Sequence, residues 1–204
     1  MTAAAPRLRL RHDERRDRLV AGTLACLARH GAKGAGVRQL CRDLGVAPSL
    51  VAHFFAGWSD LLQAAYDALA ERYLHGLHEA ATRPASPRDR LQAMIAWTLS
   101  PEELADETIG AYVALWALSR TDVDLKARFA GFHATRRALF APAIGALAAE
   151  RGVTVDADAI AASLVVVLDG FWLDLGLSPG TIPTEDAQAM ALAWVDMHLS
   201  KSHP

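Results

Sequence analysis

The residues with the clearest chemical potential lie in one stretch, "VRQLCRDLGVAPSLVAHFFAG", at residues 37–57. Apolar side chains recur at helical spacing in its first half, so the polar side chains between them face away from a core. A turn containing glycine follows, and a second apolar stripe leaves a polar face of its own. Two helices joined by such a turn can form a helix-turn-helix, whose second helix enters the major groove of DNA. Helix pairs of this kind are also common in any helical protein, so the motif alone leaves a purely structural pair open. The polar groups available for contact with DNA are Arg38, Gln39, Arg42, Ser49 and His53.

The charge distribution fits the same interpretation. Residues 1–60 contain ten Lys/Arg against five Asp/Glu, whereas residues 61–204 contain eleven against eighteen. A basic head can approach a polyanion, and an acidic body cannot. An ordinary solvated arginine-rich segment would produce the same asymmetry, so charge alone leaves both explanations open.

The elements that position these residues are expected to be helices throughout. The chain is 52% apolar, rich in alanine and poor in turn residues, which predicts an all-α protein. Ser100-Pro101-Glu102-Glu103 is a strong helix start, with serine as the cap and proline in the first position. Periodicity and capping residues predict helices near 13–30, 37–44, 48–57, 59–82, 87–99, 101–119, 122–151, 156–177 and 184–199.

The helix predicted at 156–177 is apolar around most of its circumference. It is nearly long enough to span a bilayer, but Asp169 and Asp174 would be costly in lipid. We therefore expect no membrane association and a helix covered on several sides, by its own domain or by a second copy of the chain. The N-terminus lacks the apolar core of a secretory signal, so a cytoplasmic location is expected.

The sequence gives little support for a metal site or a catalytic site. Cys26 and Cys41 sit in apolar helical patterns without CxxC spacing and are interpreted as buried free thiols rather than zinc ligands. His75, His78 and Glu79 share one helix face, but helical histidines without a further ligand are usually solvated. No nucleophile with a base and no paired catalytic carboxylates stand out, so we expect no enzyme, no metal and no cofactor.

The order of the N-terminal motifs is similar to that of a known family. A helix ending "LARHGAKGAGV" is followed by "RQLCRDLGVAPSLVAHFF" and then by "SDLL", which opens a long helix. This arrangement resembles the TetR family of transcriptional repressors, and "YVALWALSR" and "VLDGFWLDLGLS" resemble its BetI-type branch, the repressors of choline-to-betaine genes. The resemblance implies a three-helix helix-turn-helix head at residues 1–58 and a helical ligand-binding and dimerisation domain at residues 59–204. It also implies a homodimer on double-stranded operator DNA.

Four positions depart from the family pattern. Gly36, Ala47, Phe54 and Trp58 stand where the family commonly has threonine, serine or threonine, tyrosine and lysine. Each departure removes a hydroxyl or an ammonium group that could bind a phosphate, and phosphate contacts supply much of the affinity for DNA. We therefore expect weaker DNA binding, or binding that is carried by the five polar groups above and by the arginines from Arg7 to Arg18 as a flexible arm.

The body contains an aromatic set that suits a small effector. Aromatic faces with a carboxylate attract a quaternary ammonium, because the ring quadrupole binds a cation that has no hydrogen to donate. Large aromatics at helical spacing are also ordinary core residues, and Asp169 could instead cap a helix or pair at the dimer interface. The predicted ligand-binding residues are Trp97, Tyr112, Trp116, Asp169 and Trp172.

The sequence thus favours a homodimeric repressor that an amphipathic or cationic small molecule, such as choline, releases from operator DNA. The alternative is a ligand-binding or protein-interaction module of the same fold that has lost operator binding. The four lost phosphate-binding groups keep this alternative open.

Overall fold

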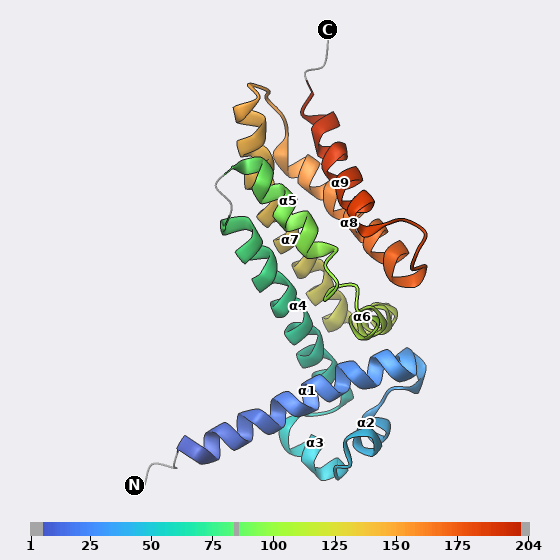
Figure 1. The fold of residues 1–204 in the computed structure, drawn as a ribbon. Coiled ribbons are helices and arrows are strands. Elements are labelled where there is room, and N and C mark those ends of the chain that lie inside the picture. The colour runs from blue at the N-terminus through green and yellow to red at the C-terminus, as the bar shows by residue number, and fades with distance from the viewer. Residues whose placement is uncertain (1–5, 84–85, 201–204) are drawn as a thin grey trace. The chain divides into compact units, whose positions relative to one another are not determined.

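The chain folds into helices in all of its described parts. The computed structural model describes residues 6–83 and 86–200, and of residues 6–11 only the backbone. No strand occurs within these ranges, in agreement with the predicted all-α class. The helices are α1 (Pro6–Gly34), α2 (Val37–Leu44), α3 (Pro48–Phe54), α4 (Trp58–Thr82), α5 (Pro87–Thr98), α6 (Asp106–Leu118), α7 (Val123–Glu150), α8 (Ala157–Leu177) and α9 (Thr184–His198) (Figure 1).

The helices group into two compact units. The first comprises the described residues up to Leu69 together with Gly110–Arg128, and the second comprises Ala70–Ile109 with the described residues from Phe129 onward. The predicted domains 1–58 and 59–204 stay a prediction. In the first unit α2 packs against both α1 and α3 (Figure 1). The core of the first unit is apolar and includes Leu19, Cys26, Leu40, Cys41, Val51, Phe55 and Leu61.

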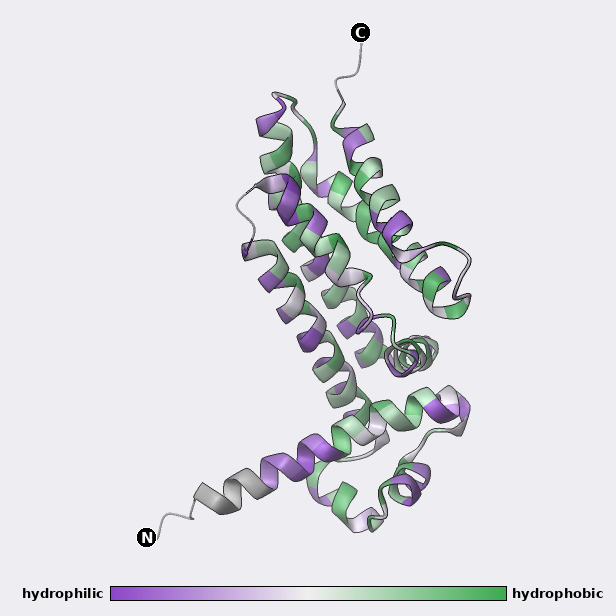
Figure 2. Ribbon diagram, in the orientation of Figure 1, coloured by the Kyte–Doolittle hydropathy of each residue, from purple (hydrophilic) through white to green (hydrophobic). Residues whose placement is uncertain are grey.

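The second unit has α5, α8 and α9 packed against one another. Its buried residues include Leu91 and Ile95 of α5, Leu164 and Leu168 of α8, and Val195 of α9. Figure 2 shows apolar segments along α8 and α9. Among the described residues, α8 alone is long and apolar enough to cross a membrane by length and composition. It packs against α5 and α9, and 33% of its apolar window is buried.

The strongest predicted helix start was wrong. Ser100 does accept the Glu103 amide, at 3.3 Å, but residues 101–104 form turns and α6 begins only at Asp106. A capping box would need the Glu103 side chain to reach back to the Ser100 amide. The Glu103 carboxylate instead lies buried at 3.1 Å from Arg72, so the serine caps a single turn.

Three further details at helix ends differ from expectation. Ser59 lies inside the first turn of α4 and donates its hydroxyl to Asp122 at 2.7 Å, so it does not cap the helix. The helix α1 begins at Pro6, so the arginines from Arg7 to Arg18 belong to a helix rather than to a flexible arm; the side chains of Arg7, Arg9 and Arg11 lie outside the described part. Arginine and leucine are good helix formers and no turn residue interrupts this stretch. Gly31 interrupts α1 with φ +64° and ψ 179°, an extended positive-φ conformation that favours glycine and not the left-handed helical cap expected there, and the helix continues to Gly34.

Candidate DNA-binding head and effector site

The helix-turn-helix is closed by its glycine and by a shared apolar core. Gly45 adopts the left-handed conformation (φ 65°, ψ 36°), and the next amide, of Val46, donates to the Cys41 carbonyl at 3.0 Å. Such a cap ends α2 abruptly and redirects the chain. Pro48 then opens α3 in its first turn. Val51 of α3 and Leu40 of α2 are buried in the same core, which fixes how the two helices cross.

The predicted DNA-binding residues lie on the outer faces of α2 and α3. Arg38, Arg42, Ser49 and His53 are exposed, whereas Gln39 is half-buried. The structure brings Arg42 and Gln39 together, because the Arg42 guanidinium donates to the Gln39 side-chain oxygen. In the free protein one nitrogen of the Arg42 guanidinium is therefore engaged with Gln39, and Gln39, whose amide nitrogen also donates to Asp43, must turn to reach DNA.

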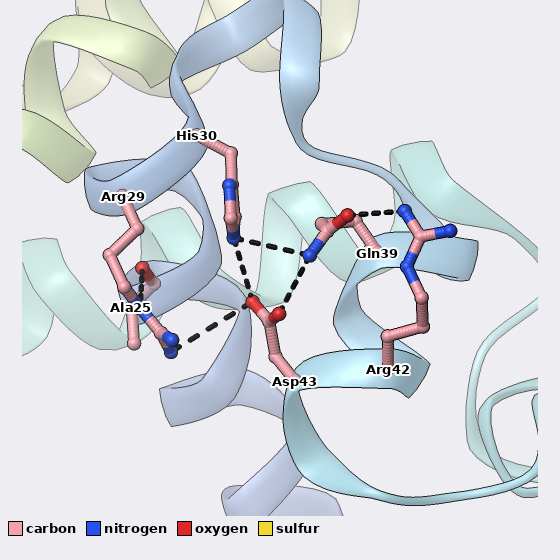
Figure 3. A network of polar contacts seen from close by, with 6 residues as sticks. All are labelled: Ala25, Arg29, His30, Gln39, Arg42 and Asp43. Carbon is pink, nitrogen blue, oxygen red and sulfur yellow. Dashed lines mark hydrogen bonds and ion pairs between the residues drawn. The ribbon is translucent and has the colours of Figure 1, made fainter.

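Gln39 belongs to a polar network centred on Asp43 (Figure 3). The Gln39 amide donates to Asp43 at 2.7 Å, and His30 Nε2 lies 3.0 Å from the other Asp43 oxygen. Arg29 forms a longer ion pair with Asp43, at 3.8 Å. Burial raises the pKa of Asp43, but the hydrogen bonds from Gln39 and His30 outweigh burial and hold the pKa below its usual value. Asp43 is thus ionised at neutral pH and ties α1 to α2.

At the four positions that depart from the family pattern, the structure shows what the residues do in place of the missing polar groups. Gly36 and Ala47 precede α2 and α3 in extended conformations, and neither helix start has a side-chain cap. Phe54 packs against the His12 ring, with centroids 4.6 Å apart, and Trp58 packs against the head core. Two of the four positions therefore contribute to packing where the family has polar groups.

The second unit contains an aromatic cluster whose indole N–H groups and tyrosine hydroxyl are hydrogen-bonded. Trp97 donates to the Tyr73 carbonyl at 2.9 Å, and Trp172 donates to the Glu103 carbonyl at 2.9 Å. The Tyr73 hydroxyl and Thr98 share a buried hydrogen bond of 2.8 Å. Trp97 lies directly on α4 at Gly76, where an added Cβ would stand 2.1 Å from the ring.

Charged groups lie among these rings. Arg136, only 3% exposed, pairs with Asp169 at 2.5 Å, and its guanidinium lies 5.2 Å and 5.4 Å from the ring centroids of Tyr73 and Phe132. His133 lies 3.7 Å from Asp169, and burial lowers the pKa of this histidine. The Asp169 carboxylate, predicted as the anchor for a cationic ligand, is therefore neutralised by an arginine of its own unit.

Glu103 is the other buried carboxyl group of this region. Burial raises its pKa from 4.5 to about 7, and the attraction of Arg72 reduces this rise without cancelling it. A carboxyl group with this pKa changes its charge near neutral pH, which makes it sensitive to a ligand that binds nearby. Sequence reasoning missed Glu103 and Arg136, because the first resembled a helix-start residue and the second an exposed helical arginine.

The predicted ligand-binding residues divide between the two units. Trp97, Asp169 and Trp172 belong to the second unit, as described above. Tyr112 and Trp116 belong to the part of α6 in the first unit, where Trp116 is 52% exposed.

Among the described residues, the ligand atoms of His75, His78 and Glu79 do not gather as a metal ion would require. Glu79 is committed to an ion pair with Arg83, at 2.7 Å, and His75 lies 3.4 Å from it on an exposed surface. Cys26 and Cys41 are buried free thiols, as predicted. Burial raises the pKa of both, although the Gly36 amide, hydrogen-bonded to the Cys26 sulfur, opposes the rise at Cys26.

Comparison with known proteins places this architecture in a family. Residues 87–200 match the family model described as "BetI-type transcriptional repressor, C-terminal". The HTH-type transcriptional regulator BetI of Ectopseudomonas mendocina is 28% identical over 191 residues, covering 92% of this chain and 95% of the relative. BetI of Rhizobium meliloti is 24% identical over 185 residues, covering 91% and 89%.

Solved structures agree. A transcriptional regulator from Pseudomonas aeruginosa PAO1 is 34% identical and superposes with a TM-score of 0.85 over 93% of this chain and 92% of that one. A regulator from Saccharomonospora viridis, solved in complex with choline, has the same fold, with a TM-score of 0.79 and 18% identity over 90% of this chain and 96% of that one. With a helix-turn-helix in its first unit and this match over its C-terminal part, the chain belongs to the BetI-type branch of the TetR family of transcriptional regulators.

Proposed function

We propose that this protein is a homodimeric repressor that binds operator DNA through α3 and is released by a small molecule. The observation that carries the proposal is the helix-turn-helix itself, with Ser49 and His53 exposed on α3 and Arg38 exposed on α2. In this docking mode the second helix lies in the major groove and the first crosses the phosphate backbone. His53 is then the group able to read bases, and Arg38 and Arg42 are the backbone contacts.

Gel shifts with the DNA upstream of its own gene test the proposal. Binding should weaken steeply as salt is raised, because each phosphate contact releases counterions. Only the lysine that Trp58 replaces is charged among the four missing groups, so the salt slope should be slightly less steep than that of a relative that retains this lysine. Failure to bind any native DNA at low salt would contradict the repressor and support the alternative, a ligand-binding or interaction module without operator recognition.

The proposed dimer uses the outer faces of α8 and α9. Val166 and Leu177 of α8 and Met190 and Met197 of α9 are large apolar residues that are more than half exposed. Exposed apolar patches of this kind mark protein interaction surfaces, and a second copy provides a self-complementary partner. Leu175 is unsuitable as a probe of this face, because it is buried within its own unit at 8% exposure.

For the effector, we propose an amphipathic or cationic molecule, and choline is the first compound to test. The aromatic cluster and the choline-bound relative of the same fold support this class. Arg136 already lies over the Tyr73 and Phe132 rings, so a quaternary ammonium bound there must compete with the guanidinium. An amphipathic carboxylate, by contrast, would pair with Arg136.

Calorimetric titration of wild type and Arg136→Met separates these classes. Choline should bind the variant more tightly than wild type if it takes the place of the guanidinium, whereas an amphipathic carboxylate should lose affinity. The control is Arg137→Met, which removes an exposed neighbouring charge. Absence of choline binding to both proteins at millimolar concentration would exclude this effector without affecting the DNA-binding proposal.

Coupling between effector and DNA is proposed to pass through α4 and α6. Inside the first unit, Gly110 of α6 lies so close to Ala28 of α1 that an added Cβ would stand 3.0 Å from its Cα. The start of α7 is held to α4 by the Arg128–Asp67 ion pair. Leu61 of α4 and Leu19 of α1 lie in the same core. A shift of α6 or α4 on ligand binding would therefore move α1, and reciprocal weakening of DNA and ligand binding is the expected result.

A further inference from the structure

Three side chains with different ligand atoms converge where α1 meets α2. The Cys26 sulfur, a His30 ring nitrogen and an Asp43 carboxylate oxygen all lie within 4.8 Å of one another. Cys26 and His30 are four residues apart on α1 and so share a face, while Asp43 comes from α2. Cys26 is fully buried, and the side chains of Asp43 and His30 are 10% and 32% exposed. The set thus extends from the core of the head to its surface, which leaves an approach through His30.

The combination of ligand types is selective. Thiolate, imidazole and carboxylate together suit Zn²⁺, which takes sulfur, nitrogen and oxygen ligands in tetrahedral sites. Three protein ligands with one open position are common for this ion. A hard cation such as Mg²⁺ would need oxygen ligands, which this set does not provide.

A hydrogen-bond donor already stands beside two of the three ligand atoms. The Gln39 side-chain nitrogen lies 2.7 Å from Asp43 Oδ1 and 3.3 Å from His30 Nε2. Both contacts are drawn as dashed lines in Figure 3. A cation bound to Asp43 would compete with this amide for the carboxylate, and His30 Nε2, which donates to Asp43 in the free protein, would bind the cation after losing its proton. Gln39 also accepts from Arg42, so displacement of its amide would loosen the hold on Arg42. Arg29, the remaining charged neighbour of Asp43, is 59% exposed and can turn into solvent.

We propose that Cys26, His30 and Asp43 form a zinc site that clamps α1 to α2, and that zinc displaces Gln39 and frees Arg42 to bind a DNA phosphate. The metal site stands independently of the proposed repressor function, whereas its effect on DNA rests on that function. The spacing of the two cysteines alone argues against a thiolate zinc site. The fold supplies the other two ligands.

Cobalt titration of the full chain tests the metal site directly. Co²⁺ should give a thiolate-to-cobalt charge-transfer band at one ion per chain, and Zn²⁺ should remove the band by displacement. Cys26→Ser should abolish the band, and His30→Gln and Asp43→Asn should weaken zinc binding by more than about tenfold. Cys41→Ser is the matched control, since this second buried thiol of the head lies outside the set and should leave binding unchanged.

Two controls distinguish loss of the metal site from loss of folding. Circular dichroism of each variant without metal verifies folding, and His30→Gln keeps the test valid if Cys26→Ser does not fold, because His30 is partly exposed. A cobalt complex without a thiolate band would overturn the site. An equal loss of binding in Cys41→Ser and Cys26→Ser would also overturn it.

Gel shifts with and without zinc test the second half of the proposal. Zinc should tighten DNA binding severalfold in wild type, and Arg42→Ala should remove this gain while retaining the cobalt spectrum. Zinc that binds without changing the affinity for DNA would refute the release of Arg42. If the protein bound no DNA at all, the repressor proposal would fail, while the cobalt spectrum would still decide the metal site.

Discussion

The buried carboxyl group of Glu103 should make the stability of the protein depend on pH. Its pKa rises from 4.5 to about 7 on folding because burial outweighs the attraction of Arg72, 3.1 Å away. The folded state therefore holds this proton more tightly than the unfolded state. The resulting stabilisation is complete below the unfolded pKa and is lost as pH rises through the folded pKa. At about 1.4 kcal/mol for each pH unit between the two values, the unfolding free energy should fall by about 3 kcal/mol by mildly alkaline pH.

Glu103→Gln isolates this contribution, since the amide keeps the shape of the protonated carboxyl group without its ionisation. Urea unfolding at a series of pH values and at fixed protein concentration gives the unfolding free energies. The variant should match wild type near pH 4 and exceed it by up to about 3 kcal/mol above pH 8. Glu71→Gln is the control, because this carboxylate of the same unit is exposed and should change little. Parallel pH curves for wild type and Glu103→Gln, or an equal effect of Glu71→Gln, would refute the reasoning.

Four other substitutions test the head, the aromatic cluster and the dimer face. In gel shifts, Arg42→Ala should weaken binding to all DNA sequences alike, whereas His53→Ala should also change the preference among operators. Gly76→Ala should lower the unfolding free energy by about 1–3 kcal/mol in urea titrations, because its Cβ would stand 2.1 Å from Trp97. Val166→Glu should shift sedimentation toward monomers, because a charge would replace a large apolar group, 69% exposed, on the proposed dimer face.

Matched positions provide the controls for these variants. Gly131→Ala, in α7, meets no atom within 4 Å, so it should be neutral or stabilising by up to about 1 kcal/mol. Val123→Glu, at a residue 79% exposed in the first unit, should leave sedimentation unchanged. Equal destabilisation by both alanine variants would contradict the clash with Trp97, and a dimer that persists in Val166→Glu would contradict the interface. Unfolding of the head by both Arg42→Ala and His53→Ala would show that these are structural residues.

Helix positions could be predicted well wherever local signals agree with packing. The helices predicted near 87–99 and 156–177 begin where local caps lie: Ser86 caps α5 by accepting the Asp89 amide at 3.1 Å, and Asp156 caps α8 by accepting the Ala159 amide at 3.0 Å. The prediction failed at Ser100, where the local capping signal was as strong. There the tertiary pairing of Glu103 with Arg72 removed the glutamate from the cap. A capping motif predicts where a helix can begin, but contacts far along the chain decide whether it continues.

The candidate sites were harder to predict because a sequence shows the type of a side chain and not its partner. Asp169 was assigned as a ligand anchor from its charge and aromatic neighbours, yet Arg136, thirty-three residues away, neutralises it. Gln39 and Arg42 were assigned to DNA from their exposed face, yet they bind each other and, through Asp43, connect to His30. In each case a second charge or hydrogen-bond partner determines whether the side chain is free to bind a ligand or DNA. A ligand at either place must therefore displace an existing partner, and this exchange of partners is how binding of a metal or a small molecule can be converted into movement of a helix.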